Sequence, residues 1–195
     1  LAQALAAYQQ ASARAPYLSI LHSRQAEMLA RLGRADDAIA AAMTAVAIDQ
    51  SRWENWHALG RAYAAQAIRD NVIVDPAGVR LAEAALLRAV ELTPATVQTA
   101  ARALDELRAA VARAQAAAAD AARAASPARR AAAQQLLQSG DAEGALAAYR
   151  ALVATDRQDR ESRMGVAAAL AALQHKDQAL AEFRQISADW PDFPF

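Results

Sequence analysis

The stretch WENWHALGRAY, residues 53–63, gathers two Trp, a Leu-Gly pair and a Tyr in one short segment. The whole chain of 195 residues contains three Trp and four Tyr, so this concentration of aromatic residues is unusual for it. A reaction site and a helix-packing surface both use such clusters. The pattern of the remaining sequence decides between these two explanations.

The composition predicts long helices and an all-α fold. Ala accounts for 60 of the 195 residues, while Gly and Pro account for six each. Ala is the strongest helix former, and it lets helices approach closely while burying little area per residue. Few turn-forming residues interrupt the chain, which argues against a β fold. Arg provides 20 of the 21 basic residues, which together with the Ala content indicates a GC-rich bacterial genome.

Charge and residue usage argue against several classes of function. The formal net charge is zero and no basic block exceeds Arg129-Arg130, so nucleic acid is not an expected partner. No run of about 18 apolar residues is present, so no membrane insertion is expected. The absence of Cys excludes disulfides and Cys-based zinc sites. No targeting segment is recognised, and the cytoplasm is preferred to the periplasm as the compartment.

Four residues of the opening stretch, Trp56, Leu59, Gly60 and Tyr63, fit the pattern W-x2-L-G-x2-Y, with Trp53 as an additional aromatic in front. This pattern resembles the first helix of the tetratricopeptide repeat (TPR) family. The resemblance implies an all-α, TPR-like superhelical solenoid of antiparallel helix pairs. In this family the second helix carries a small residue, a large apolar or aromatic residue four later, an Ala three after that, and a Pro five further on.

The second-helix pattern occurs five times along the chain, with some substitutions. Its copies are Ala4, Tyr8, Ala11 and Pro16; Ala38, Ala42, Ala45 and Gln50; Ala82, Leu86, Ala89 and Pro94; Ala145, Tyr149, Leu152 and Arg157; and Ala179, Phe183, Ile186 and Pro191. Ala38 follows Ala4 by 34 residues, and Ala179 follows Ala145 by 34. Small residues let a partner helix approach, and an aromatic residue fills the space one turn later. The cluster at 53–63 is therefore interpreted as inter-helix core.

An insertion at residues 68–79, IRDNVIVDPAGV, lengthens the third repeat. Asp75 and Pro76 mark a new helix start, with Asp as the cap and Pro at the first helical position. Asp36 and Asp141 are expected to cap second helices in the same way. The apolar triplet at 72–74 has two interpretations. Either lengthened helices bury it within the repeat, or it forms a protrusion that contacts a partner.

Residues 95–125 predict one long, Ala-rich helix, because no Gly or Pro lies between Pro94 and Pro127. Its apolar residues form two rows at heptad spacing, which are Val97, Leu104, Val111 and Ala118, and Ala100, Leu107, Ala114 and Ala121. We expect the first half to pack on the preceding repeats and the second half to act as a spacer. Self-association along the seam at 97–121 is the alternative.

The predicted organisation has three parts. Residues 1–94 form TPR-like repeats of which the first is partial, 95–125 form the helix that interrupts the solenoid, and 126–195 form a TPR-like repeat pair. The chain begins inside a second helix, and a further unit is expected to open at Asp192. Uncapped ends of a solenoid expose its stacking face. The sequence therefore predicts a piece of a longer protein, or self-association through these ends.

No constellation of residues predicts catalysis. His22, His57 and His175 are widely separated, and no H-E-x-x-H, G-x-S-x-G or G-x-G-x-x-G motif occurs. Paired acids fall at expected helix starts or solvated faces, where they complement the helix dipole or water. We therefore expect neither enzymatic activity nor a cofactor or metal site.

Binding of a partner polypeptide is the expected function, because first helices of the TPR family line a concave groove that holds a peptide. The groove candidates, placed by the register of Trp53, are Ser23, Arg24, Glu27, Arg31, Glu54, His57, Arg61, Arg130, Gln134 and Gln138. The chain lacks the Lys/Asn/Arg set with which chaperone-adaptor members hold a C-terminal carboxylate. Its N-terminal groove arginines either bind a partner's carboxylate or pair with Glu27 and Glu54. The alternative to such a non-catalytic scaffold is a TPR appendage of a larger bacterial enzyme or secretion machine.

Overall fold

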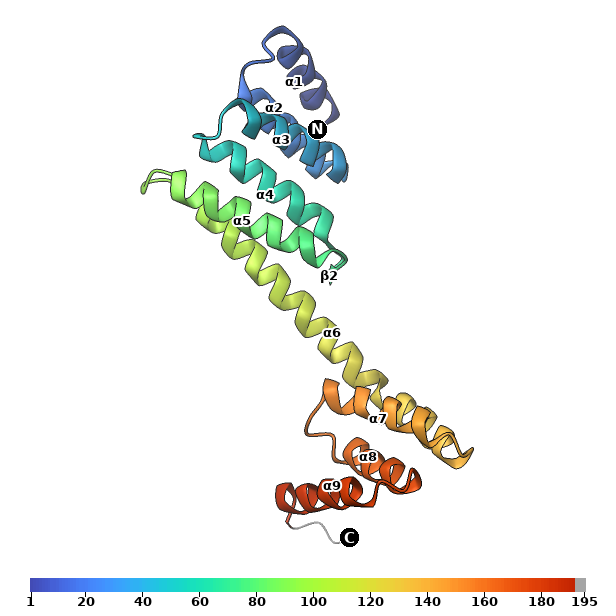
Figure 1. Cartoon of the computed structure of the whole chain (residues 1–195). Coiled ribbons are helices and arrows are strands. Elements are labelled where there is room, and N and C mark those ends of the chain that lie inside the picture. The colour runs from blue at the N-terminus through green and yellow to red at the C-terminus, as the bar shows by residue number, and fades with distance from the viewer. Residues whose placement is uncertain (192–195) are drawn as a thin grey trace. The chain divides into compact units, whose positions relative to one another are not determined.

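The computed structural model describes residues 1–191 and is almost entirely helical (Figure 1). Its elements are α1 (Ala2–Arg14), α2 (Ser19–Arg31), α3 (Ala35–Ile48), α4 (Trp53–Ala67), β1 (Ile68–Arg69), β2 (Val72–Ile73), α5 (Pro76–Leu92), α6 (Thr99–Gln138), α7 (Ala142–Thr155), α8 (Arg160–Ala172) and α9 (Lys176–Asp189). The chain divides into unit 1, Leu1–Ala117, and unit 2, Ala118–Phe195. The prediction of a further repeat from Asp192 lies outside the described residues.

Each unit consists of consecutive helices that pack on one another. In unit 1, α2 contacts α1, α3 and α4, and α4 contacts α5; in unit 2, α8 contacts α7 and α9. The five copies of the second-helix pattern fall in α1, α3, α5, α7 and α9. Their small residues Ala38, Ala82 and Ala145 are fully buried. The predicted all-α architecture of helix pairs is confirmed.

The aromatic cluster at 53–63 belongs to the core of unit 1. Trp56 and Tyr63 pack in one core cluster with Leu59 of their own helix and with buried Ala residues of α2, α3 and α5, among them Ala42. At Gly60 the backbones approach closely, because a Cβ there would lie 2.6 Å from the Leu86 Cγ on α5. A missing side chain is what allows this contact. The stretch is a packing surface, as its pattern predicted.

Helix α6 is longer than the sequence indicated. The expected helix ends before Pro127, whereas α6 continues through this residue to Gln138. A Pro inside a helix removes one backbone hydrogen bond and costs about 3 kcal/mol. The flanking residues 128–133 are rich in Ala, the best helix former, and beyond them Ala133, Leu136 and Leu137 pack into the core of unit 2. This burial keeps the chain helical past Pro127.

The first part of α6 completes the core of unit 1. Leu104 and Leu107 are buried together with Ala82 and Leu86 of α5, and Val111 packs beside them. Residues 115–121 are exposed throughout. Leu104, Leu107 and Val111 of the predicted seam are thus used for packing within the chain, whereas Ala118 and Ala121 further along it are exposed.

The insertion at 68–79 contains a β-hairpin, so the prediction that lengthened helices bury its apolar triplet is wrong. Ile68 pairs with Ile73 and Arg69 with Val72, and the turn residues Asp70 and Asn71 have φ of 50° and 59°. Asn and Asp tolerate positive φ, and a two-residue turn of this kind matches the twist of a hairpin. Val72 and Val74 remain 57% and 54% exposed. An apolar run such as that at 72–74 fits a buried segment as well as an exposed strand, so it does not by itself indicate the hairpin.

Replacing both Val72 and Val74 with Ser is expected to change the free energy of unfolding by less than about 0.5 kcal/mol for each residue, because both side chains are largely solvated. Replacing Ile73, which is half-buried and faces Ile68, is expected to cost more. Chemical denaturation of the two variants measures the difference. A large loss of stability for the double Val variant would contradict the exposed position of these side chains.

Two of the three predicted helix caps are present. The Asp75 carboxylate accepts a hydrogen bond from the Ala77 N–H, and the Asp141 carboxylate accepts one from the Gly144 N–H. Pro76 occupies the first turn of α5, as expected. Asp36 is not a cap, because the cap position of α3 is Arg34 and Asp36 lies within the first helical turn. Its carboxylate instead complements the helix dipole and accepts a hydrogen bond from Gln66.

Candidate functional site

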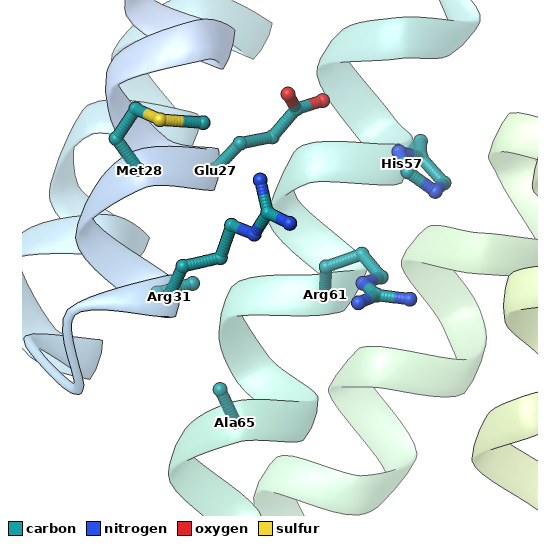
Figure 2. A pocket seen from close by; sticks show the side chains of 7 residues that line it. Glu27, Met28, Arg31, His57, Arg61 and Ala65 are labelled. Carbon is teal, nitrogen blue, oxygen red and sulfur yellow. The ribbon is translucent and has the colours of Figure 1, made fainter. Parts of the chain in front are cut away.

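A hollow of about 450 Å³ lies between α2 and α4 of unit 1. Its lining residues are Glu27, Met28, Ala30, Arg31, His57, Arg61 and Ala65 (Figure 2). Figure 2 shows Glu27 and Arg31 extending from α2 on the side that faces α4, where His57 and Arg61 lie. We call this hollow the α2–α4 groove.

Helical periodicity explains why these side chains meet. Glu27 and Arg31 are four residues apart, and so are His57 and Arg61, so each pair shares one helix face. The helices α2 and α4 are the first helices of consecutive pairs and contact each other directly. Four of the groove candidates are therefore brought together in one place. Ala30 and Ala65 also line the hollow, although the sequence did not predict them as groove residues. Their small side chains leave space between α2 and α4.

Of the three arginines in and beside the α2–α4 groove, two form ion pairs and one does not. The Arg24 guanidinium donates to the Glu27 carboxylate at 2.8 Å, and this hydrogen bond is the main cause that raises the pKa of Arg24. Arg61 forms a 2.8 Å ion pair with Glu106 of α6. Among residues 1–191, Arg31 has no ion pair or side-chain hydrogen bond. The groove therefore presents one guanidinium whose charge is not compensated locally.

His57 contributes a neutral imidazole to the groove. Burial lowers its pKa below the usual value, the nearby guanidinium groups of Arg61 and Arg24 lower it further, and the carboxylates of Glu27 and Glu106 oppose the shift. The ring meets Trp53 edge-on, with centroids 5.9 Å apart. At neutral pH the side chain is thus uncharged and can both donate and accept a hydrogen bond.

The remaining N-terminal candidates lie outside the hollow. Ser23 is buried beneath the surface, where its hydroxyl donates to the Asn55 side chain. Glu54 pairs with Arg52 at 3.3 Å. Arg24 pairs with Glu27, which is one of the two roles expected for the groove arginines. Arg31 has no such pair among the described residues, so the other role, binding of a partner's carboxylate, stays a prediction for it. Glu106 was not a candidate from the sequence, because it lies on the long helix and not on an expected groove helix, 45 positions after its partner Arg61.

In unit 2, Arg130 and Gln134 line a separate hollow together with Tyr149, Arg160, Glu161 and Met164. Arg130 forms ion pairs with Glu161 and, at 3.5 Å, with Asp159. Gln138 is the last residue of α6, is exposed, and does not line this hollow. Two of the three C-terminal candidates therefore share one site.

Among residues 1–191, no group of three or more His, Asp or Glu side chains is arranged to hold a metal ion. A bilayer-spanning segment is not found among the helices of the described residues, since none combines the required length with enough apolar side chains.

Comparisons with known proteins give similarities of fold. No family model matches the chain, and the search of curated proteins returns no relative. Among solved structures, the chain is similar to YrrB, described as a TPR protein with an unusual peptide-binding site, with a TM-score of 0.43, 16% sequence identity, and coverage of 95% of this chain and 93% of YrrB. It is also similar to MamA, with a TM-score of 0.37, 15% identity, and coverage of 98% and 86%.

The repeat architecture rests on the chain's own features. The second helices recur after 34 residues from Ala4 to Ala38 and from Ala145 to Ala179, buried Ala residues of these helices mark the packing positions, and consecutive helices pair within each unit. Together these features give the chain an all-α, TPR-like fold.

Proposed function

We propose that unit 1 is a protein-interaction module that binds an extended segment of a partner polypeptide in the α2–α4 groove. The observation that carries this proposal is the convergence of Glu27, Arg31, His57 and Arg61 on one hollow of about 450 Å³. Small-ligand sites occupy about 300 to 1,000 Å³, so the hollow has room for one or two side chains of a bound segment.

An acidic side chain of the partner is the group that the groove favours. Arg31 carries an uncompensated guanidinium, and the fork geometry of a guanidinium matches a carboxylate with two parallel hydrogen bonds. Arg61 is 51% exposed in its pair with Glu106, so its charge also contributes to the local field. The neutral imidazole of His57 adds a further hydrogen-bonding group without repelling either arginine. The partner segment is therefore expected to place an Asp or Glu against α2.

Apolar contacts complete the proposed site. Met28, Ala30 and Ala65 form the apolar part of the lining. Met adapts its shape to different neighbours, and the two Ala residues keep the groove open to a polypeptide backbone. A non-catalytic binding role is consistent with this lining of charged, small and apolar side chains.

Reversal of one charge tests the proposal. In a pull-down from cells of the source organism with the full chain, Arg31→Glu is expected to reduce recovery of the specific partner at least tenfold, because a second carboxylate would face the partner's acid. The direct measurement is the affinity of the recovered partner for each variant by calorimetry. Undiminished binding by Arg31→Glu would refute a role for this groove.

Arg80→Glu is the matched control for Arg31→Glu. Arg80 lies on α5, is exposed, and has no ion pair or side-chain hydrogen bond among the described residues, as is true of Arg31. The two variants have the same net charge, so a general electrostatic effect would weaken binding equally in both. A loss confined to the Arg31 variant assigns the effect to the α2–α4 groove.

A further inference from the structure

A second hollow in unit 2, of about 390 Å³, has a chemistry that differs from that of the α2–α4 groove. It is lined by the end of α6, by Tyr149 of α7 and by the first turns of α8, and its residues are Arg130, Gln134, Tyr149, Arg160, Glu161 and Met164. We call it the Tyr149 hollow. All of its residues belong to unit 2.

Tyr149 is the most informative residue of this hollow. Its side chain is deeply buried, with the residue only 6% exposed, and its ring lies against Gly165, where a Cβ would come within 2.3 Å of the ring. Among residues 1–191 its hydroxyl has no hydrogen-bond partner. Burial raises the pKa of Tyr149, with the nearby charge of Arg130 opposing the shift, so the hydroxyl keeps its proton and can donate. Because Tyr149 lines the hollow and its hydroxyl is unpaired among the described residues, this hydroxyl is available to a ligand.

Arg130, which also lines the Tyr149 hollow, carries a second hydrogen-bond donor without an acceptor among the described residues. Its terminal nitrogen pairs with Glu161 and Asp159, yet its Nε is buried and has no hydrogen-bond partner in the part of the chain that the structure describes. The side-chain amide of Gln134 is exposed at the rim and is likewise unpaired within the described part of the chain. The Tyr149 hollow therefore combines donors that have no protein acceptor among the described residues with a carboxylate, Glu161, that accepts.

We propose that the Tyr149 hollow binds the side-chain carboxamide of an Asn or Gln in a partner polypeptide, as a site separate from the α2–α4 groove. The carboxamide oxygen accepts hydrogen bonds from the Tyr149 hydroxyl and the Gln134 amide. The carboxamide NH₂ donates to the Glu161 carboxylate. Met164 supplies an apolar wall for the aliphatic part of the bound side chain.

Charge balance distinguishes a carboxamide from a charged ligand. The guanidinium groups of Arg130 and Arg160 and the carboxylates of Glu161 and Asp159, both paired with Arg130, balance the charge around the hollow, so an added carboxylate would meet Glu161 as an extra negative charge. An added ammonium would meet Arg130 and Arg160 in the same hollow. Like charges that approach each other in a partly buried site cost free energy. A neutral group that both donates and accepts avoids each of these costs.

Selection from a phage-displayed library of short random peptides on the full chain provides the probe. Peptides that bind unit 2 are expected to share an Asn or Gln, and changing that residue to Asp or Glu should weaken binding about tenfold. Tyr149→Phe removes one hydroxyl and preserves the ring, and it is also expected to weaken these peptides about tenfold, since the ligand's oxygen is left unpaired. Affinities are measured by fluorescence anisotropy of labelled synthetic peptides.

Two controls separate this proposal from the function proposed for unit 1. Tyr17→Phe removes the same hydroxyl from a residue that is 72% exposed in unit 1, and it should leave the selected peptides unaffected. Arg31→Glu should likewise leave them unaffected, since it alters only the α2–α4 groove. The proposal is overturned if no selected peptide is sensitive to Tyr149→Phe while the variant remains folded by circular dichroism. It is equally overturned if acidic counterparts bind as tightly as the amide peptides.

Discussion

Replacing Asn55 with Ala is expected to lower the free energy of unfolding of unit 1 by about 3 kcal/mol. Asn55 on α4 is fully buried, and its side-chain NH₂ donates to the carbonyl oxygens of Ala45, at 3.1 Å, and Asp49, at 2.7 Å. Its carbonyl oxygen accepts from the Ser23 hydroxyl of α2. The substitution leaves these partners unsatisfied and opens a cavity where three helices meet.

Amide hydrogen exchange, followed peptide by peptide in α2, α3 and α4, measures this loss within unit 1. Exchange of the most protected amides is expected to accelerate on the order of 100-fold. Gln66→Ala is the matched control, because the Gln66 amide donates to Asp36 on the surface, at 2.6 Å. This control should change stability by less than about 0.5 kcal/mol. Equal effects of the two variants would show that the buried bonds of Asn55 contribute no more than a surface contact.

Gly165→Ala is expected to destabilise unit 2 by about 2 kcal/mol, although Ala favours a helix over Gly by about 1 kcal/mol. Gly165 lies within α8, and an added Cβ would lie 2.3 to 2.5 Å from three carbon atoms of the Tyr149 ring. That ring is buried in the core of unit 2 with Leu146, Leu152 and Leu170, so it has little room to move. Steric overlap therefore outweighs the gain in helix propensity.

A double-mutant cycle identifies the cause of this effect. In a Tyr149→Ala background the obstructing ring is absent, and Gly165→Ala is then expected to stabilise unit 2 by up to about 1 kcal/mol. Hydrogen exchange in α7 and α8 reports both single variants and the double variant. If Gly165→Ala destabilises unit 2 equally in both backgrounds, the clash with Tyr149 is not the reason that this position requires Gly.

Local patterns of this chain were predictable because they follow from helix periodicity. The second-helix pattern of small, large and Ala residues, which comes from the resemblance to the TPR family, predicts Ala38, Ala82 and Ala145 as core residues, and all three are buried. Helix periodicity places Glu27 with Arg31, and His57 with Arg61, on one helix face each, because residues one turn apart share a face whatever the surrounding structure. That these faces line a groove was an expectation from the same resemblance.

The features that the sequence did not reveal depend on contacts between distant segments. Ser23 has the spacing of a groove residue, yet the position of Asn55 draws its hydroxyl into the core. Glu106 forms an ion pair with Arg61 because α6 packs beside α5 in the same core cluster. The two residues are 45 positions apart along the chain.

The sequence by itself determined the helix pairs, the 34-residue spacing found at each end of the chain, and which residues share a helix face, since these depend on side chains within a few turns of one another. Only the tertiary structure decided that α6 continues through Pro127, that residues 68–73 form a hairpin, and which groove charges remain unpaired. In each of these cases a local preference competes with packing against another element. The balance depends on which neighbours are present, and a local pattern does not contain that information.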